Sequence, residues 1–545
     1  MAANGKLQAR IRMYRQGLGD CFLLRFWREG DNDDEGNPKR FHILIDCGVL
    51  GNSESDKDML TRVAENIRDE TGNHLNLLIA THRHWDHLAG FLLVQPVFDL
   101  MTIDQVWAGW TEDPQDPQAR RMWKGADTGM LGVYAALSLA EQMGGNVELL
   151  DGGESADNED NNNVAQANRT RAARKEMRAA VHALMMGFSG DPPEEEVLDE
   201  GQEEADAMSL LSQLLRGMLP PLAAGGVRKD PKKAMRYITG RSVRDVDYLE
   251  PKDGDRTRQP KTVQGLEGVR FYVLGPPREE DYLRHFNLRK SDPKGIIFEF
   301  TGPAFASSFI ASVGLTPVDA EEGPASELAK QYLPFDGGHR LKDADPRTAK
   351  FIKDHYGLDE TPSSTGRWRR IDDDWMDVAS GLALWLNSVV NNTSLALAIE
   401  LVESDSVLMF VADAQIGNWE SWGELSWTVR DANGETKKVD IADLFGRTVL
   451  YKVGHHGSHN ATLQNNGLNL MKRPDLVAMI PVDEDTARAQ TNRHNPDGWQ
   501  MPAAHLSAAL EKKARGRVLR ADKPVPPGIR GATEGELWID LELGK

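Results

Sequence analysis

The amino-acid sequence predicts a mixed α/β protein, and three features support this class. Short apolar runs typical of buried strands alternate with segments whose apolar residues recur at helical spacing. Several of these runs end in clusters of His, Asp and Gly, which is where layered α/β folds usually carry their chemistry. The composition, with 40% hydrophobic and 27% charged residues, is that of a folded globular protein.

Length and charge limit the domain organisation and the partners. The 545 residues suggest three or four domain-sized units, or one core with large insertions, at about 150 residues per domain. A net charge of -20 repels polyanions, so any contact with nucleic acid must be local. Cys21 and Cys47 lie in apolar runs and are expected to be free, buried thiols. No apolar stretch reaches the roughly 18 residues that span a bilayer, so a cytoplasmic location without membrane contact is expected.

The first part of the chain contains three expected elements and then an insertion. Residues 6–46 are expected to form two strands joined by a turn, and residues 56–70 a helix. A buried strand then leads into the polar cluster THRHWDH. The composition becomes polar and acidic from about residue 153, which indicates a helical acidic insertion over 154–235.

Strand-like sequence returns at GVRFYVLGPP, within the core segment 236–277, and a second insertion of irregular composition follows over 278–375. The remainder reads as a helix over 375–390, strands over 394–401 and 406–414, the segment VLYKVGHHGSHN and the strand LVAMIPV. Residues 1–153 and 376–545 are therefore expected to form the two halves of one core, the second closing with a helix and a strand.

The densest cluster of chemically active residues consists of His82, His84, Asp86 and His87, directly after the expected buried strand. Packing alone does not explain four such side chains, because buried polar groups must be satisfied. Coordination of a divalent metal would satisfy them together, and imidazole with carboxylate suits zinc, manganese or iron. The alternative is an exposed histidine cluster without a ligand.

Two later strand ends carry further candidates. Asp413 ends the apolar strand VLMFVADA, where it either caps a turn or bridges two cations, and the histidine cluster favours bridging. In KVGHHGSHN, one of His455 and His456 is expected to bind metal while the other contacts substrate or orients the first. For Ser458 and His459 the alternative is ordinary loop polarity, and His494 is a weaker candidate for the same edge.

Together these motifs resemble the metallo-β-lactamase fold, a four-layer αββα sandwich with a metal site at one edge of its two sheets. The resemblance is closer to the ComEC-like hydrolase domain of DNA-uptake proteins and its stand-alone soluble relatives. It covers roughly residues 7–150, 268–277 and 376–525. Besides the histidine motif, the matching segments are RQGLGDC, DCG at 46–48, LGPP at 274–277, NNTSL at 391–395, ADA at 412–414, the HHGS loop and the closing tail 501–522.

The resemblance implies a shared set of metal ligands, with one or two ions bound and zinc expected before manganese. A first group would contain His82, His84 and Asp413, and a second Asp86, His87, Asp413 and one of His455 and His456. Asp46 and Asp20 are expected to support the ligand imidazoles from behind. Two departures stand out: NNTSLAL lacks the histidine usual for the wider fold, and Ala412 replaces the usual glycine.

The resemblance implies a phosphodiesterase or nuclease that uses a metal-bound hydroxide on nucleic acid or a nucleotide. Asp86, His456 and His459 are the expected catalytic residues, with a histidine protonating the leaving oxygen. One alternative is a hydrolase of a small ester, lactone, thioester or phosphocholine-type substrate. Another is a docking or regulatory subunit with a vestigial metal site. The insertions are expected to narrow the cleft and to make oligomer or partner-protein contacts.

Overall fold

The computed structural model describes residues 5–33, 36, 38–124, 126–127, 229–251, 259–285, 347–348, 350–351, 387–430, 435–491 and 497–544. Nearly all of the two expected insertions, 154–235 and 278–375, therefore lies outside the described residues, as does His494. Of the helix expected over 375–390, only the end is described, and residues 387–392 are helical.

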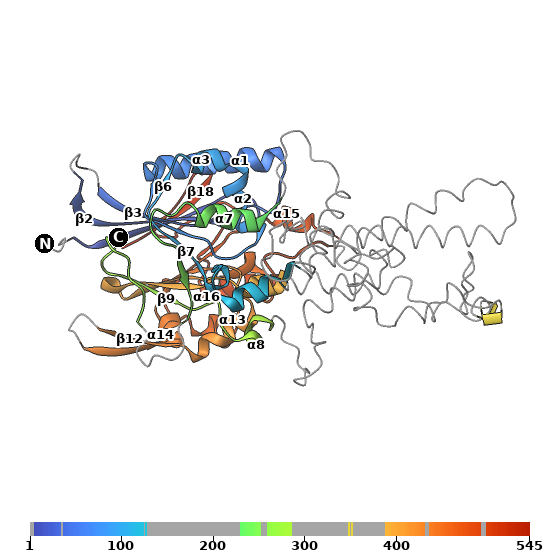
Figure 1. Cartoon of the computed structure of the whole chain (residues 1–545). Coiled ribbons are helices and arrows are strands. Elements are labelled where there is room, and N and C mark those ends of the chain that lie inside the picture. Colours follow the sequence, from blue (N-terminus) through green and yellow to red (C-terminus); the bar gives the residue numbers. More distant parts are fainter. Residues whose placement is uncertain are drawn as a thin grey trace.

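Two β-sheets form the centre of the described structure (Figure 1). The eight-stranded sheet has the order β17 (Ala532–Glu534), β18 (Trp538–Leu543), β1 (Leu7–Tyr14), β2 (Cys21–Asn32), β3 (Pro38–Cys47), β5 (Leu77–Ile79), β7 (Val106–Gly109) and β8 (Asp247–Leu249). The six-stranded sheet has the order β16 (Val518–Arg520), β15 (Val477–Ile480), β14 (Thr448–Lys452), β11 (Ser406–Phe410), β10 (Leu397–Leu401) and β9 (Val269–Val273). Two short pairs join β12 (Ser426–Arg430) to β13 (Thr436–Asp440) and β4 (His74–Leu75) to β6 (Thr102–Ile103).

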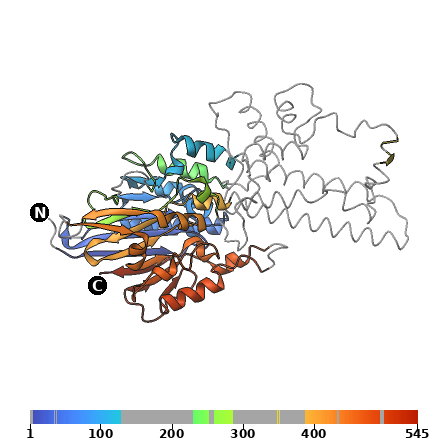
Figure 2. The ribbon, with the colours of Figure 1, turned by 90° about the horizontal axis from the view of Figure 1, so that it is seen from below.

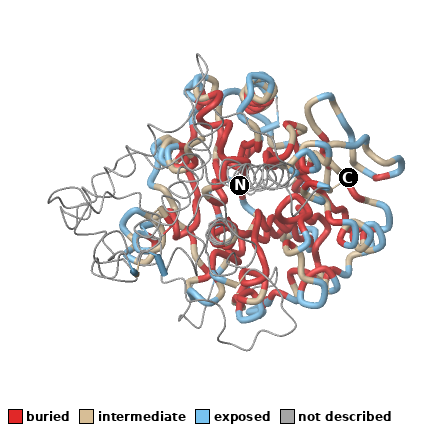
Figure 3. The backbone as a smooth tube through the Cα atoms, turned by 90° about the vertical axis from the view of Figure 1, so that its right-hand side faces the viewer, coloured by how far each residue is buried: buried red, intermediate tan, exposed pale blue. Residues whose placement is uncertain are grey.

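Apolar side chains from both sheets pack against one another and form one continuous core. The rings of Phe22 on β2 and Phe410 on β11 meet edge to face at 5.5 Å between centroids. Alternation along each strand explains this packing: on β1, Ile11 and Met13 belong to the core between the sheets, whereas Arg12 points to the other face. Figure 3 shows the buried residues running through the middle of the molecule.

Helices cover the outer face of each sheet (Figures 1 and 2). The first sheet carries α1 (Glu54–Thr71), α2 (Trp85–Leu93), α3 (Gln95–Phe98) and α7 (Pro231–Thr239), which share an apolar cluster with it. The second sheet carries α13 (Ile416–Ser421), α14 (Ile441–Gly446), α15 (Glu484–Arg488) and α16 (Ala504–Lys513). The short helix α8 (Glu280–Leu283) packs against α13. A capping box at Ser53 begins α1, and Gly72 ends it in the left-handed conformation.

The predicted mixed α/β class is confirmed, and one detail of the first segment is wrong. Residues 6–46 were expected to form two strands, but they form three, because the chain turns between β1 and β2. Gly17 and Gly19 have φ angles of 110° and 158°, which explains why glycine occupies this turn. The thiols of Cys21 and Cys47 are free and buried, as predicted. Within the described residues, no helix has both the length and the apolarity needed to cross a membrane.

Strand direction determines where the polar clusters lie. Strands β3, β5 and β7 are mutually parallel, and so are β11, β14 and β15. Their carboxyl ends therefore meet at one edge of each sheet, where ligand sites of open α/β sheets are commonly found. Asp46 lies at the end of β3, His82 follows β5, Asp413 follows β11 and Lys452 ends β14.

Candidate metal centre

Residues from three distant parts of the chain converge in one buried cluster. The loop after β5 supplies His82 and His84, the first turn of α2 supplies Asp86 and His87, and Asp413 follows β11. His456 comes from the turn Gly454–Gly457 after β14. All six side chains are buried. Five of them, together with Asp20, offer candidate ligand atoms in two groups, each within 4.8 Å: His82, His84 and Asp413, and His87, His456, Asp413 and Asp20.

The two nitrogens of each imidazole in the second group have different surroundings. His87 donates Nδ1–H to Asp46 Oδ2 at 2.8 Å, and His456 donates Nδ1–H to the carbonyl of Pro481 at 2.8 Å. Their Nε2 atoms face inward, 3.3 Å and 3.7 Å from Asp413 Oδ2. Asp86 Oδ2 lies 2.9 Å from His456 Nε2. Each Nε2 therefore points at carboxylate oxygens, which is favourable when the imidazole is protonated or a cation lies between them.

Asp46 is held rigidly behind His87. Its Oδ1 accepts a hydrogen bond from the backbone N–H of Thr81 at 2.9 Å, and its Oδ2 accepts one from the Thr81 hydroxyl at 2.6 Å. Burial raises the pKa of Asp46, against the lowering effect of His87 and Thr81. A carboxylate that fixes the tautomer and orientation of a ligand imidazole is the usual second element of a metal site.

The cluster concentrates negative charge away from water. Asp20, Asp46, Asp86 and Asp413 are all buried, and Lys452 is the buried ammonium beside them. Burial lowers the pKa of His87, but Asp413, Asp20, Asp46 and Asp86 outweigh it and raise that pKa well above its ordinary value. With neutral imidazoles, four carboxylates and one ammonium leave three negative charges. Protons on His87 and His456, whose pKa values the carboxylates raise, or a bound cation would supply the missing positive charge, because isolated buried charge is strongly unfavourable.

Several buried oxygens in the cluster have no hydrogen bond. Asp86 Oδ1, Asp413 Oδ2 and Asp20 Oδ1 find no donor with acceptable geometry among the described residues. Burial raises the pKa of Asp413, but His87, His456 and His455 outweigh it and hold that pKa well below its usual range. Burial lowers the pKa of His84 to about 3, so this imidazole stays neutral and able to bind a metal. These buried His and Asp groups can hold a metal ion.

Asp20 lies on the far side of the histidines, which argues against its being a direct ligand. It is 3.8 Å from His87 Nδ1 and 3.6 Å from His456 Nδ1, the two nitrogens already bonded elsewhere. Its Oδ2 atom, which is the oxygen nearer to His87, is paired with the ammonium of Lys452. Asp20 lies close enough to be grouped with the possible ligands, but these contacts agree better with the predicted supporting role.

Two glycine turns bring the first sheet against the histidine motif. A Cβ on Gly19 would lie 2.4 Å from the Gly48 carbonyl oxygen and 2.6 Å from that of Asp86. A Cβ on Gly48 would lie 2.3 Å from the Asp86 carbonyl. The backbone N–H of Asp20 also donates to the Asp86 carbonyl at 3.0 Å. Only glycine fits this close approach, which explains the RQGLGDC and DCG motifs in physical terms.

The adjacent histidines His455 and His456 make different contacts. His455 lies 3.9 Å from Asp413 through Nε2, and its Nδ1 is 2.9 Å from Ser458 Oγ. Burial lowers the pKa of His455 to about 4. His456, by contrast, contacts both Asp86 and Asp413. His459 is exposed, and no described residue of the cluster forms a hydrogen bond or ion pair with it.

Sequence reasoning missed three residues that complete the centre. Thr81 fixes Asp46, Lys452 pairs with Asp20, and Ser394 accepts the Asp413 backbone N–H at 3.2 Å. Lys452 could have been noticed, because it is a lone lysine in the otherwise apolar strand VLYKVG. Arg83, between two candidate ligands, pairs with Glu112 and stacks 4.1 Å from the ring of Trp123.

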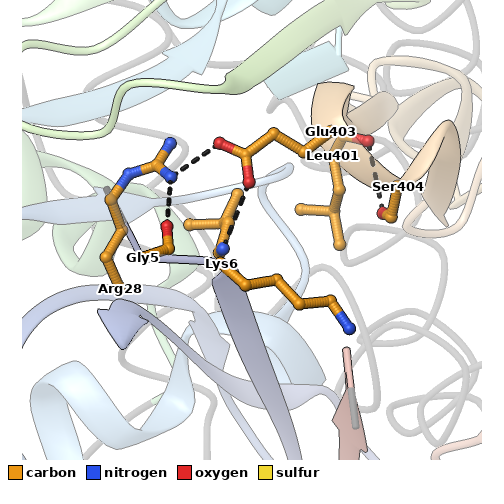
Figure 4. Close-up of a pocket in the computed structure, with 7 residues that line it drawn as sticks. Gly5, Lys6, Arg28, Leu401, Glu403 and Ser404 are labelled. Carbon is orange, nitrogen blue, oxygen red and sulfur yellow. Dashed lines mark hydrogen bonds and ion pairs between the residues drawn. The ribbon is translucent and has the colours of Figure 1, made fainter. Parts of the chain in front are cut away.

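A separate pocket of about 470 Å³ lies at the opposite end of β2 from Asp20 (Figure 4). It is lined by Gly5, Lys6, Leu7, Arg28, Leu401, Glu403 and Ser404. Arg28 is paired with Glu403, whose carboxylate also accepts the backbone N–H of Leu7 at 3.2 Å. The charges of Arg28 and Glu403 are therefore already used within the protein, and the Lys6 ammonium donates to the Gly544 carbonyl.

Comparison of the chain with protein-family models, curated proteins and solved structures found no match.

Proposed function

We propose that this protein is a metal-dependent hydrolase of the metallo-β-lactamase fold, and that it acts as a phosphodiesterase or nuclease. The single observation that carries the proposal is the convergence of His82, His84, Asp86, His87, Asp413 and His456 in one buried cluster. The two mixed sheets with helices on their outer faces agree with the αββα arrangement of that fold.

A bound divalent cation lowers the pKa of water from about 15.7 to near 7, and so makes a nucleophile available at neutral pH. The protein's own part is to present ligand atoms in fixed positions. His82, His84 and Asp413 would hold one ion, and Asp86, His87, Asp413 and His456 a second. Asp46 keeps the Nδ1 proton of His87 directed outward, so that Nε2 stays free to bind.

Proton transfer to the leaving oxygen needs a further group. His455 presents Nε2 to the cluster, and exposed His459 lies four residues further along the same loop. We assign this step to His459, because His456 is engaged by Asp86 and Asp413 and the lowered pKa of His455 leaves its imidazole without a proton to donate.

The substrate class rests on the resemblance to ComEC-like hydrolases. Lys452 and Arg83 are basic side chains close to the cluster, and each is paired with a carboxylate. A single strand or a small nucleotide needs less basic surface than a duplex, which suits the net charge of -20.

The test combines metal analysis of the purified protein with a substrate panel. Single-stranded DNA, RNA, cyclic nucleotides and a generic phosphodiester are compared with lactone and thioester substrates, with and without added zinc or manganese. The double variant Asp86→Ala, His87→Ala is the control. Metal-dependent phosphodiester cleavage that is lost in the variant supports the proposal. Cleavage of only the ester-type substrates, or a protein that binds no divalent metal, would contradict it.

A further inference from the structure

Lys452 occupies an unusual place for a lysine. It ends β14, and only 1% of its side chain is exposed. Its ammonium pairs with Asp20, donates to the Ala412 carbonyl at 3.0 Å and lies 3.7 Å from Asp413 Oδ1. A buried ammonium has three donors to satisfy, and here three oxygens surround it.

These contacts join the two sheets at the proposed metal centre. Asp20 belongs to the turn between β1 and β2 of the first sheet, whereas Ala412 and Asp413 follow β11 of the second. The Asp20 turn is itself fixed, because its backbone bonds to Asp86 and Gly48. Lys452 therefore holds the segment containing Asp413 in register with the segment containing Asp86 and His87.

The backbone next to Asp413 requires such support. Ala412 has φ +48°, in the left-handed region that disfavours a residue with a Cβ. Its carbonyl accepts hydrogen bonds from the Lys452 ammonium and from the backbone N–H of His455 at 3.1 Å. A strained conformation persists only where surrounding contacts determine it, and these two bonds supply such contacts.

The two oxygens of Asp413 are consequently distinct. Oδ1 accepts the His455 backbone N–H at 3.2 Å and faces Lys452. Oδ2 faces the Nε2 atoms of His87 at 3.3 Å and His456 at 3.7 Å. One oxygen is thus held by the protein, while the other is directed at the candidate ligands.

We propose that Lys452 is a positioning residue of the metal centre, which holds Asp413 so that only its Oδ2 atom faces the metal ligands. This inference rests on the proposed function, because it presumes that a divalent cation binds there. A simpler view is that Lys452 only neutralises Asp20. The two views make different predictions. A positioning effect acts through Ala412 and Asp413, so the loss of Lys452 should still weaken metal binding when Asp20 carries no charge.

The experiment measures zinc and manganese affinity by titration calorimetry, and the visible spectrum of the Co²⁺-loaded protein. Lys452→Met is compared with Arg447→Met, which lies just before the opposite end of β14 and removes a buried cation paired with Glu400. We expect Lys452→Met to weaken metal binding about 10- to 100-fold and to alter the Co²⁺ spectrum. Arg447→Met should lower the melting temperature but leave metal affinity and spectrum unchanged.

The double variant Asp20→Asn, Lys452→Met removes both charges of the ion pair, and it replaces the single variant in the titration if that variant folds poorly. Continued weak binding with an altered spectrum supports positioning. Wild-type affinity and spectrum in either variant would overturn the inference. A wild-type protein that binds no divalent metal would instead refute the proposed function, so the two failures can be told apart.

Discussion

Replacing Asp46 by Asn tests whether the carboxylate behind His87 serves metal binding. Asn keeps the shape of the side chain but removes its charge and replaces one acceptor by an NH₂ donor. Both Asp46 oxygens accept hydrogen bonds, from the Thr81 backbone and hydroxyl and from His87 Nδ1. An amide cannot accept all three, so either Thr81 or His87 loses its partner.

The expected loss in metal affinity is about 10- to 100-fold, which corresponds to about 1.4 to 2.7 kcal/mol. The stability of the metal-free protein should change much less. Burial raises the pKa of Asp46, so its folded-state pKa exceeds the unfolded value. The charged form is therefore disfavoured in the folded protein, and stability decreases as the pH rises through this range. Asn removes that penalty and offsets the lost hydrogen bond.

The matched control is Asp540→Asn in the same sheet. Asp540 is buried and accepts hydrogen bonds from Arg12 Nε at 2.7 Å and Arg12 Nη2 at 2.8 Å, on the face covered by α1. Breaking a buried ion pair typically costs about 3–5 kcal/mol, so this variant should melt at a lower temperature. Its metal affinity, measured by the same calorimetric titration, should equal that of the wild type. If Asp46→Asn also binds metal like the wild type, the supporting role assigned to Asp46 is wrong.

Three further predictions concern metal binding, the shared ligand Asp413 and a buried histidine of the first sheet. Zinc at one hundred times its dissociation constant should stabilise the protein by about 2.7 kcal/mol, and EDTA should reverse the shift in a thermal melt; an unchanged melt would argue against the site. Asp413→Asn should abolish measurable metal binding in calorimetry while the circular dichroism spectrum stays the same, because Asp413 belongs to both ligand groups; retained binding would refute a shared ligand. Burial and the charge of Arg25 lower the pKa of His42 to about 4. The free energy of unfolding should therefore fall as the pH decreases from about 6.5 to 4, by at most about 1.4 kcal/mol per pH unit. Urea denaturation at several pH values should show a weaker dependence of this free energy on pH in His42→Gln than in the wild type, and an equal dependence would contradict the assignment.

Local sequence patterns were sufficient to predict the α/β class and the main candidate ligands. Apolar runs predicted strands β5, β9, β11 and β15, because a buried strand needs apolar residues on both faces. Placement of polar residues at strand ends was equally informative, since parallel strands bring their carboxyl ends to one edge. His82 and Asp413, which 331 positions separate, were paired because their motifs resemble those of the metallo-β-lactamase fold, and their side chains do lie together.

Features that depend on three-dimensional contacts were not predictable in this way. Nothing in the adjacent letters HH distinguishes His455 from His456, and both residues have a positive φ angle, of +44° and +52°. Only their contacts separate them, because His456 reaches Asp86 whereas Nδ1 of His455 meets Ser458. The break between β1 and β2 was missed because the glycines of RQGLGD allow both a bent and an extended chain. Thr81 and Ser394 are short polar residues whose importance comes only from the carboxylates they contact.

The balance of charge connects the site to the stability of the whole fold. Asp20, Asp46 and Asp86 belong to the first sheet and its loops, whereas Asp413 belongs to the second, so Asp413 joins the other three carboxylates only when the sheets pack. In the unfolded chain these groups are solvated and far apart, and no assembled metal site exists. The binding energy of the proposed metal ion would then be folding energy, because the cation would compensate repulsion that folding creates. Lys452 supplies a fixed part of that compensation in the absence of metal. The metal-free fold should therefore persist, with the edge between the two sheets as its least stable part, and hydrogen exchange at Thr81 and Asp413 should slow when zinc is added.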